Sequence, residues 1–568
     1  MKRLITTESE TILSGSELLL EAISQEERTI FMGQPSYSLI PLFDEIYKSQ
    51  ANTEIIHTLH EQATVHAADG FARVTGRPGV AIIPAGPGLT NAITGLATAY
   101  MDSVPLVVIT AQVATSELGK DSFQEVDING MTTSVAKHSF LVRNISEIPQ
   151  MVKDAFYLAK AGRPGPIIIV LPKDKMIEKI GATTLINNSI IHKKLNNITI
   201  PDSILTHSFN EITSAKKPVL LIGGGVISSG ATKYLKEFVN KTNIPVTSTL
   251  MGLSAYPSDD PLHLGMVGMH GTVAANKAIH QADLLLVLGV RFSDRVTGRI
   301  NAFSPQSKKI HVEIDAAEIN KIIPVDYPVV GDIKEFLYFM NENWNKEIDN
   351  VWVNKTLTWL KDSPQYNRSS STLKPQDVIQ LLSTATDGEA IVVTDVGQHQ
   401  IWTAHNYTFK QSRSLLTSGG LGTMGYGLPA AIGAAASDKS RPVICISGDG
   451  GIQMNIQELL TCSKYDLPIK LVIMNNGYLG MVRQWQELFY NRRYSQVKIS
   501  SPNFCSLGEA YGIKSYNAST YEDAMGVISE AFATLEPTVM EFNVKEEENV
   551  FPIVPPGGSN QEAMFEKS

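Results

Sequence analysis

The sequence predicts an α/β protein made of three consecutive doubly wound parallel-sheet domains. Strand-like apolar runs alternate with helical stretches from end to end, which is the pattern of parallel α/β sheets. Several of these runs lead directly into glycine-rich turns. Two polar, aperiodic stretches, 177–203 and 342–375, interrupt the alternation and are typical of linkers. The predicted domains are therefore 1–190, 191–345 and 360–568.

The bulk properties exclude several classes of protein. The chain has 568 residues, 43% of them hydrophobic, and a net charge of −9. It contains neither a block of Lys and Arg that would indicate nucleic-acid binding nor an apolar run of about 18 residues that could cross a membrane. Glu8, Glu10 and Glu21 interrupt the N-terminal region, which argues against a signal peptide. The three cysteines lack metal-ligand spacing. Taken together, these properties lead us to expect a soluble cytoplasmic protein.

In the first domain, residues 55–60 are predicted as a strand, and a helix follows from Glu61 to about Ala72. Residues 80–100 predict a strand, a Gly-Pro-Gly turn and a helix, and 105–110 predict the next strand. A glutamate in the first turn of a helix is commonly there only because the helix dipole favours it. On this pattern alone, Glu61 is a helix-start residue.

The middle domain opens with a strand that runs into three glycines, within 218–226. Two further strand ends carry polar residues, within 282–295 and 309–318. Because ligands of open parallel sheets bind beyond the carboxyl ends of strands, these turns are candidate binding loops. The triple glycine lacks the complete dinucleotide-binding spacing and is a weak signal by itself.

The third domain holds the most informative stretch. A strand over Val443–Ile446 meets the turn Gly448-Asp449-Gly450, a helix is predicted from Ile452 to Tyr465, and a second strand ends at Asn475-Asn476. A right-handed crossover brings both strand ends to one sheet edge. Asp449 and Asn476 are therefore expected side by side, and their oxygens suit Mg²⁺ when substrate phosphates complete the octahedron. An ordinary turn with an aspartate helix cap is the alternative reading of Gly-Asp-Gly.

The stretch GDGGIQMNIQELLTCSKYDLPIKLVIMNNGYLGMVRQWQELFYNRRYS resembles the catalytic subunit of the acetohydroxyacid synthase (acetolactate synthase) family. Further similar segments are HEQATVHAADGFARVTGRPGV and SDDPLHLGMVGMHGTVAANKA. The resemblance covers about 15–555. It implies pyrimidine-binding, central FAD-binding and diphosphate-binding domains, with thiamine diphosphate, Mg²⁺ and FAD as cofactors.

The resemblance also implies an activity. Pyruvate would lose CO₂, and the resulting hydroxyethyl carbanion would attack a second 2-keto acid. The products would be 2-acetolactate, or 2-aceto-2-hydroxybutyrate from 2-ketobutyrate, in branched-chain amino-acid biosynthesis. The family builds its active sites between two chains, so a homodimer or tetramer is implied, with a possible regulatory small subunit.

Residue roles follow from the matching motifs. Glu61 would be the catalytic carboxylate that bonds the aminopyrimidine ring, because the thiazolium carbon must lose a proton near neutral pH. Mg²⁺ would be bound by Asp449, Asn476 and the main-chain carbonyl of Tyr478. Met424 would wedge the cofactor into its bent shape, although its sequence context alone favours a core residue. The other thiamine diphosphate contacts would be Val396, Gly397, Gln398, His399, Gly422, Gly450, Gly451 and Met481.

The matching positions also imply a flavin site and a substrate site. The flavin residues would be Arg163, Gly223, Gly224, Thr249, Leu250, Met269, His270, Gly289, Arg291, Arg295, Glu313 and Asp332; in this family the flavin has no net redox role. The substrate residues would be Phe123, Gln124, Lys137, Met481 and Trp485. An aromatic ring over a small apolar pocket can discriminate one methylene by about 1–3 kcal/mol. Trp485 could equally be a core residue of an amphipathic helix.

The departures from the family lie mostly in the first domain. A family Tyr-Pro-Gly-Gly-Ala loop reads Gln34-Pro35-Ser36-Tyr37-Ser38 here, and the remaining changes are Ala63, Val65, Pro84, Ala85, Val170 and Ser293. The altered loop would border the reacting carbon. Two alternatives therefore stay open: a thiamine diphosphate carboligase or decarboxylase with another acceptor, and a non-catalytic paralogue. The acceptor preference, any feedback inhibitor and the oligomer beyond a dimer are not fixed by the sequence.

Overall fold

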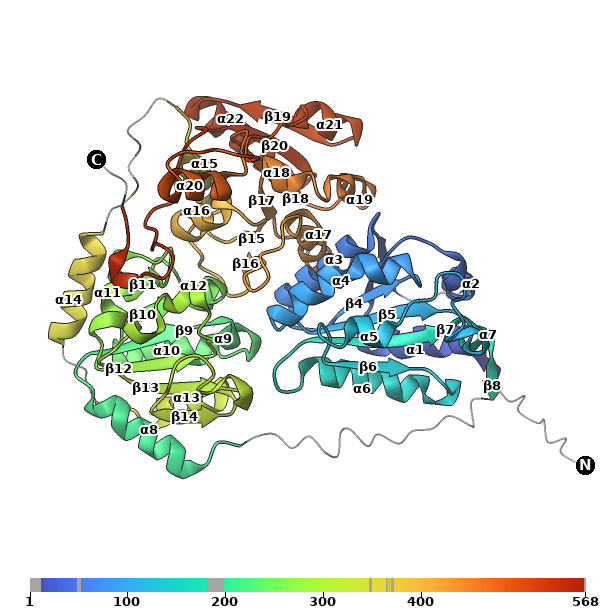
Figure 1. Cartoon of the computed structure of the whole chain (residues 1–568), viewed down its shortest axis with the longest axis horizontal. Coiled ribbons are helices and arrows are strands. Elements are labelled where there is room, and N and C mark those ends of the chain that lie inside the picture. Colours follow the sequence, from blue (N-terminus) through green and yellow to red (C-terminus); the bar gives the residue numbers. More distant parts are fainter. Residues whose placement is uncertain are drawn as a thin grey trace, which may run out of the picture. The chain divides into compact units, whose positions relative to one another are not determined.

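The structure is a computed structural model that describes residues 12–48, 53–181, 199–346, 350–363, 366, 368 and 372–565. The chain divides into two compact units, one of residues 1–196 with 432–437 and one of residues 197–431 with 438–568. The first contains one six-stranded parallel sheet and the second contains two, each with flanking helices (Figure 1). Residues 182–198 of the first predicted linker, and 347–349, 364–365, 367 and 369–371 of the second, lie outside the described residues. The predicted domain boundaries therefore stay predictions.

The first unit contains a six-stranded parallel sheet in the order β3-β2-β4-β5-β7-β6. Its strands are β2 (Thr29–Met32), β3 (Glu54–His57), β4 (Gly79–Ile83), β5 (Leu106–Gln112), β6 (His138–Leu141) and β7 (Pro166–Pro172). A short antiparallel pair joins β1 (Ile12–Ser14) to β8 (Lys179–Gly181). The central strands are buried along their whole length, as expected for a parallel sheet covered on both faces.

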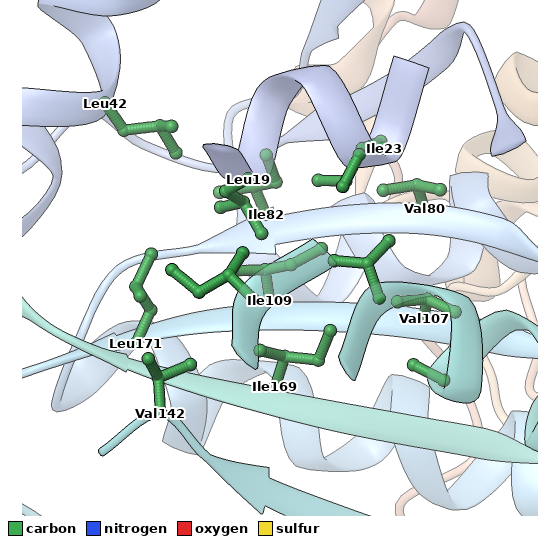
Figure 2. Packing of buried hydrophobic residues seen from close by; sticks show 14 of the residues in the cluster. Leu19, Ile23, Leu42, Val80, Ile82, Val107, Ile109, Val142, Ile169 and Leu171 are labelled. Carbon is green, nitrogen blue, oxygen red and sulfur yellow. The ribbon is translucent and has the colours of Figure 1, made fainter. Parts of the chain in front are cut away.

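Helices cover both faces of this sheet. On one face, Leu19 and Ile23 of α1 (Gly15–Glu26) pack over Ile82 and Ile109 (Figure 2). Helix α1 starts at a capping box in which Ser14 and Glu17 bond each other's backbone N–H groups, at 3.2 and 2.6 Å. On the other face lie α3 (Glu61–Thr75) and α4 (Pro87–Met101). The remaining helices are α2 (Ile40–Lys48), α5 (Ile128–Thr132), α6 (Ile148–Lys160) and α7 (Lys173–Ile177), with 3₁₀ turns at Tyr37–Leu39, Thr115–Glu117 and Ile145–Glu147.

The second unit contains two six-stranded parallel sheets. The central one has the order β11-β10-β9-β12-β13-β14. Its strands are β9 (Pro218–Ile222), β10 (Val246–Ser248), β11 (His263–Met266), β12 (Leu284–Leu288), β13 (Lys308–Glu313) and β14 (Tyr327–Val330). Its helices are α8 (Asp202–Ser214), α9 (Gly224–Ser228), α10 (Thr232–Thr242), α11 (Val273–Gln281), α12 (Asp294–Thr297), α13 (Ile333–Asn343) and α14 (Asn350–Lys361), with 3₁₀ turns at Leu250–Ala255, Ile300–Ala302 and Ala316–Glu318.

The third sheet has the order β16-β15-β17-β18-β20-β19 and is also parallel. Its strands are β15 (Ile391–Thr394), β16 (Leu415–Leu416), β17 (Val443–Gly448), β18 (Ile469–Asn475), β19 (Lys514–Ala518) and β20 (Thr538–Asn543). Its helices are α15 (Pro375–Ala385), α16 (Gln398–Asn406), α17 (Gly427–Ser437), α18 (Asp449–Ile452), α19 (Leu459–Lys464), α20 (Gly480–Phe489), α21 (Phe504–Ala510) and α22 (Tyr521–Phe532), with 3₁₀ turns at Ile456–Glu458 and Asn560–Glu562.

The predicted class of three parallel-sheet α/β domains is confirmed. One predicted element differs: the helix expected from Ile452 to Tyr465 is divided into α18, a 3₁₀ turn and α19. The break falls at Asn455, whose buried side-chain amide donates to the carbonyl of Gly425 at 2.7 Å. That bond fixes the chain in a non-helical conformation there. The bond from Asn455 connects the segment after the Gly-Asp-Gly turn to the loop that precedes α17.

Candidate active site

A pocket lies at the carboxyl ends of β15, β17 and β18, which are neighbours in the third sheet. This is the edge at which open parallel sheets bind ligands. Most residues expected to contact the diphosphate and its metal line this pocket: Val396, Gly397, Gln398, His399, Met424, Asp449, Gly450, Gly451, Asn476, Tyr478 and Met481.

Asp449 is buried at the start of α18, directly after β17. Its Oδ2 accepts hydrogen bonds from the N–H of Gly477, at 3.0 Å, and from the hydroxyl of Ser501, at 3.1 Å. Burial raises the pKa of this carboxyl to about 6, against the lowering effect of these bonds. A cation bound at this carboxylate would favour its ionised form.

Asn476 follows the end of β18, so the crossover brings it to the same pocket as Asp449. Its Oδ1 accepts a hydrogen bond of 3.1 Å from the N–H of Tyr478. An amide oxygen has a second lone pair, which leaves one for a metal. The pocket therefore offers one carboxylate, one amide oxygen and the main chain at Tyr478, the hard ligand set that suits Mg²⁺.

Two buried polar atoms of this pocket support a diphosphate ligand. Among the described residues, Nε2 of His399 and Oε1 of Gln398 have no hydrogen-bond partner. Burial also lowers the pKa of His399 to about 4, so its ring is neutral near pH 7. Buried polar groups left unpaired are costly and call for a partner. A Cβ at Gly448 would lie 3.2 Å from His399 Nδ1, and one at Gly450 would lie 2.8 Å from Leu479, so glycine keeps the backbone accessible. These features fit thiamine diphosphate with Mg²⁺.

Gly422 is the one residue expected at the diphosphate that does not line this pocket. A Cβ built there would meet only Cγ1 of Val396, at 4.0 Å. The loop is nevertheless fixed against the pocket by Asp395, a residue that the sequence did not single out. Its buried carboxylate accepts hydrogen bonds from the N–H groups of Val396, at 2.7 Å, and Gly425, at 3.0 Å. Asp395 therefore joins the end of β15 to the loop that carries Met424.

Glu61 lies in the first unit, at the first position of α3, and is 4% exposed. Its Oε2 accepts a hydrogen bond of 3.0 Å from the side-chain amide of Asn91 on α4. Its Oε1 accepts one of 3.3 Å from the N–H of Gln34. A Cβ at Gly33 would lie 2.9 Å from the Glu61 side chain, so glycine is needed for this approach. A glutamate that only begins a helix needs neither this burial nor two hydrogen-bond donors to its carboxylate. The environment of Glu61 therefore indicates more than a helix start.

The altered loop 34–38 lies beside Glu61, since the N–H of Gln34 donates to its carboxylate. Ser38 Oγ accepts from the N–H of Ala85, at 3.3 Å, and lies 2.7 Å from Ser36 Oγ. Tyr37 is 69% exposed, and the ammonium of Lys173 lies 3.0 Å from the centre of its ring. The two substituted residues Ser38 and Ala85 therefore bond each other, and Tyr37 extends outward over a lysine that the sequence did not single out.

The expected substrate residues are distributed over both units. Phe123 is 85% exposed, and Gln124 packs against Gly86 at the start of α4. The ammonium of Lys137 donates to the carbonyls of Leu158 and Ala161, at 2.6 and 2.8 Å. An ammonium carries three N–H donors, so these two bonds do not decide the matter and the substrate role of Lys137 stays a prediction. On α20, Met481 lines the pocket and Trp485 is half-buried, with its ring 5.3 Å from that of Phe489.

The expected flavin residues of the second unit gather at the carboxyl ends of β9, β10, β12 and β13. Gly289 has a φ of 60°, and a Cβ there would lie 2.5 Å from Cα of Gly225, so these loops meet backbone to backbone. Met269 N–H donates to the carbonyl of Arg295 at 2.8 Å. Gly223, Gly224, Thr249, Leu250 and Arg291 lie at the same strand ends.

The remaining flavin positions include buried polar groups. His270 is buried, its Nδ1 lies 3.2 Å from the carbonyl of Pro552, and burial lowers its pKa to about 4. Burial raises the pKa of Glu313, although its carboxylate accepts from the N–H of Ile314 at 2.8 Å. Asp332 caps α13. Arg163 belongs to the first unit, where its Nε donates to the hydroxyl of Ser103 at 2.9 Å.

No helix in the described part of the chain combines the length and the apolar character needed to cross a membrane.

Comparison with known proteins matches three family models along the chain. Residues 13–131 match the N-terminal TPP binding domain of thiamine pyrophosphate enzymes, 205–340 match their central domain, and 395–542 match their C-terminal TPP binding domain. The central match contains the whole second sheet, whereas the N-terminal match ends before β6 and β7 and the C-terminal match begins just after β15.

Curated relatives match over nearly the whole length. The acetolactate synthase large subunit of Haemophilus influenzae is 40% identical, with 98% of both chains covered. The acetolactate synthase isozyme 3 large subunit of Escherichia coli is 40% identical, with 98% of this chain and 99% of the relative covered. The acetolactate synthase large subunit of Lactococcus lactis is 42% identical, over 97% and 96% of the two chains.

Proposed function

The chain belongs to the acetolactate synthase large subunits, a family of thiamine diphosphate enzymes, and from this premise we propose which of its residues carry out the reaction. The enzyme is a transferase that decarboxylates pyruvate and joins the two-carbon fragment to a second 2-keto acid. The product is 2-acetolactate, or 2-aceto-2-hydroxybutyrate when the acceptor is 2-ketobutyrate. Its cofactors are thiamine diphosphate, Mg²⁺ and FAD.

The observation that carries the assignment of the metal site is the pocket that brings Asp449 and Asn476 together beside unpaired atoms of His399 and Gln398. Asp449, Asn476 and the carbonyl of Tyr478 would hold Mg²⁺ and, through it, the diphosphate. Gly450 and Gly451 would let the backbone approach the phosphates, because no side chain intervenes. Met424 would support the bent cofactor from the loop that Asp395 fixes.

When bound, the cofactor supplies an acidic thiazolium carbon and an electron sink for the decarboxylation. Glu61 would exchange a proton with the pyrimidine ring through its carboxylate. Asn91 and the backbone of Gln34 hold that carboxylate in place, at 3.0 and 3.3 Å. Phe123, Gln124, Met481 and Trp485 would border the keto acids and exclude water.

We further propose a homodimer or tetramer in which Glu61 of one chain and the metal site of another complete each active site. The family resemblance supports this arrangement. The relatives are named large subunits, which supports a regulatory small subunit. Domain boundaries near 190 and 345–360 and a cytoplasmic location are also part of this proposal.

The test is reconstitution. Protein stripped of metal and cofactor by chelation should form no acetolactate from pyruvate. Adding thiamine diphosphate with Mg²⁺ should restore 2-acetolactate, and neither addition alone should do so. Product formation that survives complete removal of both would contradict the proposal.

A further inference from the structure

Helix α20 presents two different faces. Met481 and Val482 line the cofactor pocket, and Trp485 is half-buried next to Phe489. Arg483 and Gln484 are fully buried, each with 0% exposure. A charged and an amide side chain at full burial must be satisfied by specific partners. The buried face of α20 is therefore held by polar bonds, and those bonds determine where the other face lies.

Gln484 makes three hydrogen bonds. Its Nε2 donates to the carbonyl of Val550, and its Oε1 accepts from the N–H of the same residue, both at 2.8 Å. The same Oε1 accepts from Nε2 of Gln398 at 2.8 Å. One amide thus pairs with both backbone groups of Val550 and with the first residue of α16. Such a planar, two-bond pairing fixes orientation as well as distance.

The partners of Gln484 are themselves held in place. Gln398 lines the cofactor pocket, and its Nε2 also donates to the carbonyl of Glu548 at 3.0 Å. That carbonyl accepts a second bond, of 2.9 Å, from Nη2 of Arg483. The carboxylate of Glu548 pairs with Lys374 at 3.1 Å and with Lys545 at 2.9 Å. Gln484 therefore connects α20 to a firmly anchored segment.

Helix α20 also approaches Gln398 closely. A side chain at Gly480, the first residue of the helix, would collide with Oε1 of Gln398. A helix packed this tightly cannot shift toward α16, and the bond from Gln398 to Gln484 prevents it from shifting away. The distance between Gln398 on α16 and the Met481–Trp485 face of α20 can therefore neither shorten nor lengthen easily.

We propose that Gln484 is a positioning residue for acceptor specificity, acting by holding Trp485 and Met481 at a set distance from Gln398. The inference rests on the proposed function, in which this face of α20 borders the second keto acid. Gln484 itself does not contact the substrate. A pocket that measures one methylene needs walls placed to a fraction of an ångström, and its discrimination is at most about 200-fold.

The chain supplies a matched control on the same helix. Gln486 pairs with both backbone groups of Ser495, its Nε2 donating at 3.0 Å and its Oε1 accepting at 2.9 Å. The two glutamines therefore make the same type of backbone pairing from one helix. Gln486, however, bonds an exposed turn and makes no bond to Gln398 in the described structure. Loss of Gln486 should leave the pocket unchanged.

The experiment compares Q484L, Q484E and Q486L as full-length holoenzymes. The primary measurement is the ratio of 2-aceto-2-hydroxybutyrate to 2-acetolactate formed from equal concentrations of 2-ketobutyrate and pyruvate. Affinity for thiamine diphosphate with Mg²⁺, and hydrogen exchange of the amides of 480–489, are measured in parallel. Q484E keeps both acceptor bonds of Oε1 but places a carboxylate oxygen opposite the Val550 carbonyl, so it breaks the same pairing with a different side chain if Q484L does not fold.

We expect Q484L to change the product ratio by about 5- to 100-fold, within the range that one methylene can supply. Q484E should change the ratio in the same direction, because its carboxylate cannot pair with the Val550 carbonyl, and Q486L should stay within about twofold of wild type. Amides of 480–489 should exchange faster in Q484L while cofactor affinity stays within about threefold. A wild-type ratio in Q484L or Q484E, accompanied only by lower stability or rate, would overturn the inference. A wild-type enzyme that makes neither product would instead refute the proposed function.

Discussion

Oδ2 of Asp449 accepts a hydrogen bond of 3.0 Å from the N–H of Gly477. Asp449 follows β17 and Gly477 follows β18, so this bond joins two loops at the ends of adjacent parallel strands. It also orients the carboxylate toward the pocket that Asn476 lines. The bond therefore holds the Asp449 carboxylate at the edge of the pocket.

We predict that D449A abolishes tight binding of thiamine diphosphate with Mg²⁺ and leaves the fold intact. The substitution removes the only carboxylate among the proposed metal ligands. S501A is the matched control, because it removes the 3.1 Å bond to the same Oδ2 but no ligand. Calorimetric titration should show a loss beyond measurement for D449A and a much smaller, still measurable change for S501A, since one hydrogen bond to a charged group contributes about 1.5–3 kcal/mol. Wild-type affinity in D449A would remove Asp449 from the metal site.

For Glu61 we predict that E61Q binds the cofactor but exchanges its thiazolium proton about 10²–10⁴-fold more slowly, the usual size of a general acid–base effect. Hydrogen–deuterium exchange at that carbon, followed by NMR after rapid quench, measures this directly. N91A should give a smaller decrease, because the carboxylate remains and loses only its 3.0 Å donor. Exchange at the wild-type rate in E61Q would exclude Glu61 from proton transfer.

The flavin site gives a third prediction. G289A should lose FAD, because a Cβ there would lie 2.5 Å from Cα of Gly225 and push two binding loops apart. G230A is the control: its φ of 69° is equally strained for alanine, but no atom lies within 4 Å of the added carbon. Flavin absorbance after gel filtration should decrease in G289A alone. Wild-type protein should carry or accept FAD without stoichiometric reduction during turnover, and a middle domain that binds no flavin would contradict this part of the account.

A fourth prediction concerns Tyr37, which stands where the resemblance implies a glycine. If its side chain reduces the pocket volume, the double variant S36G/Y37G should increase the rate with 2-ketobutyrate more than with pyruvate. The shift should be at most about a hundredfold, because one methylene is worth about 1–3 kcal/mol. Competition between the two acceptors measures it. An unchanged product ratio would mean that Tyr37, 69% exposed beside Lys173, extends away from the pocket and that Trp485 sets the preference.

The sequence predicted the ends of strands better than the bonds between distant residues. Asp449 and Asn476 were placed together correctly, because apolar runs and a crossover rule locate strand ends. The helix after Asp449 was predicted too long, because the bond from Asn455 to Gly425 that interrupts it spans 30 residues. Asn91 bonds Glu61 across 30 residues, and Gln484 bonds Val550 across 66. An amide on a helix carries no sign of such a partner in its local pattern.

Asp395 illustrates the same limit at the cofactor pocket. In the sequence it is a polar residue at a strand end, one of several. Its role follows from burial and from the N–H groups of Val396 and Gly425, which converge on it from two loops. The bonds of Lys137 show the same limit, because nothing in its local pattern indicates that its ammonium donates to the carbonyls of Leu158 and Ala161, 21 and 24 residues away.

The most direct test of the account is the stoichiometry of pyruvate turnover by the purified holoenzyme. Acetolactate synthesis consumes two pyruvates for each CO₂ released and forms one 2-acetolactate. We predict these ratios with wild-type protein, thiamine diphosphate and Mg²⁺, measured by NMR of the products together with trapped CO₂. One pyruvate consumed for each CO₂, with acetaldehyde as the product, or no turnover at all, would contradict the assignment of this chain as an acetolactate synthase.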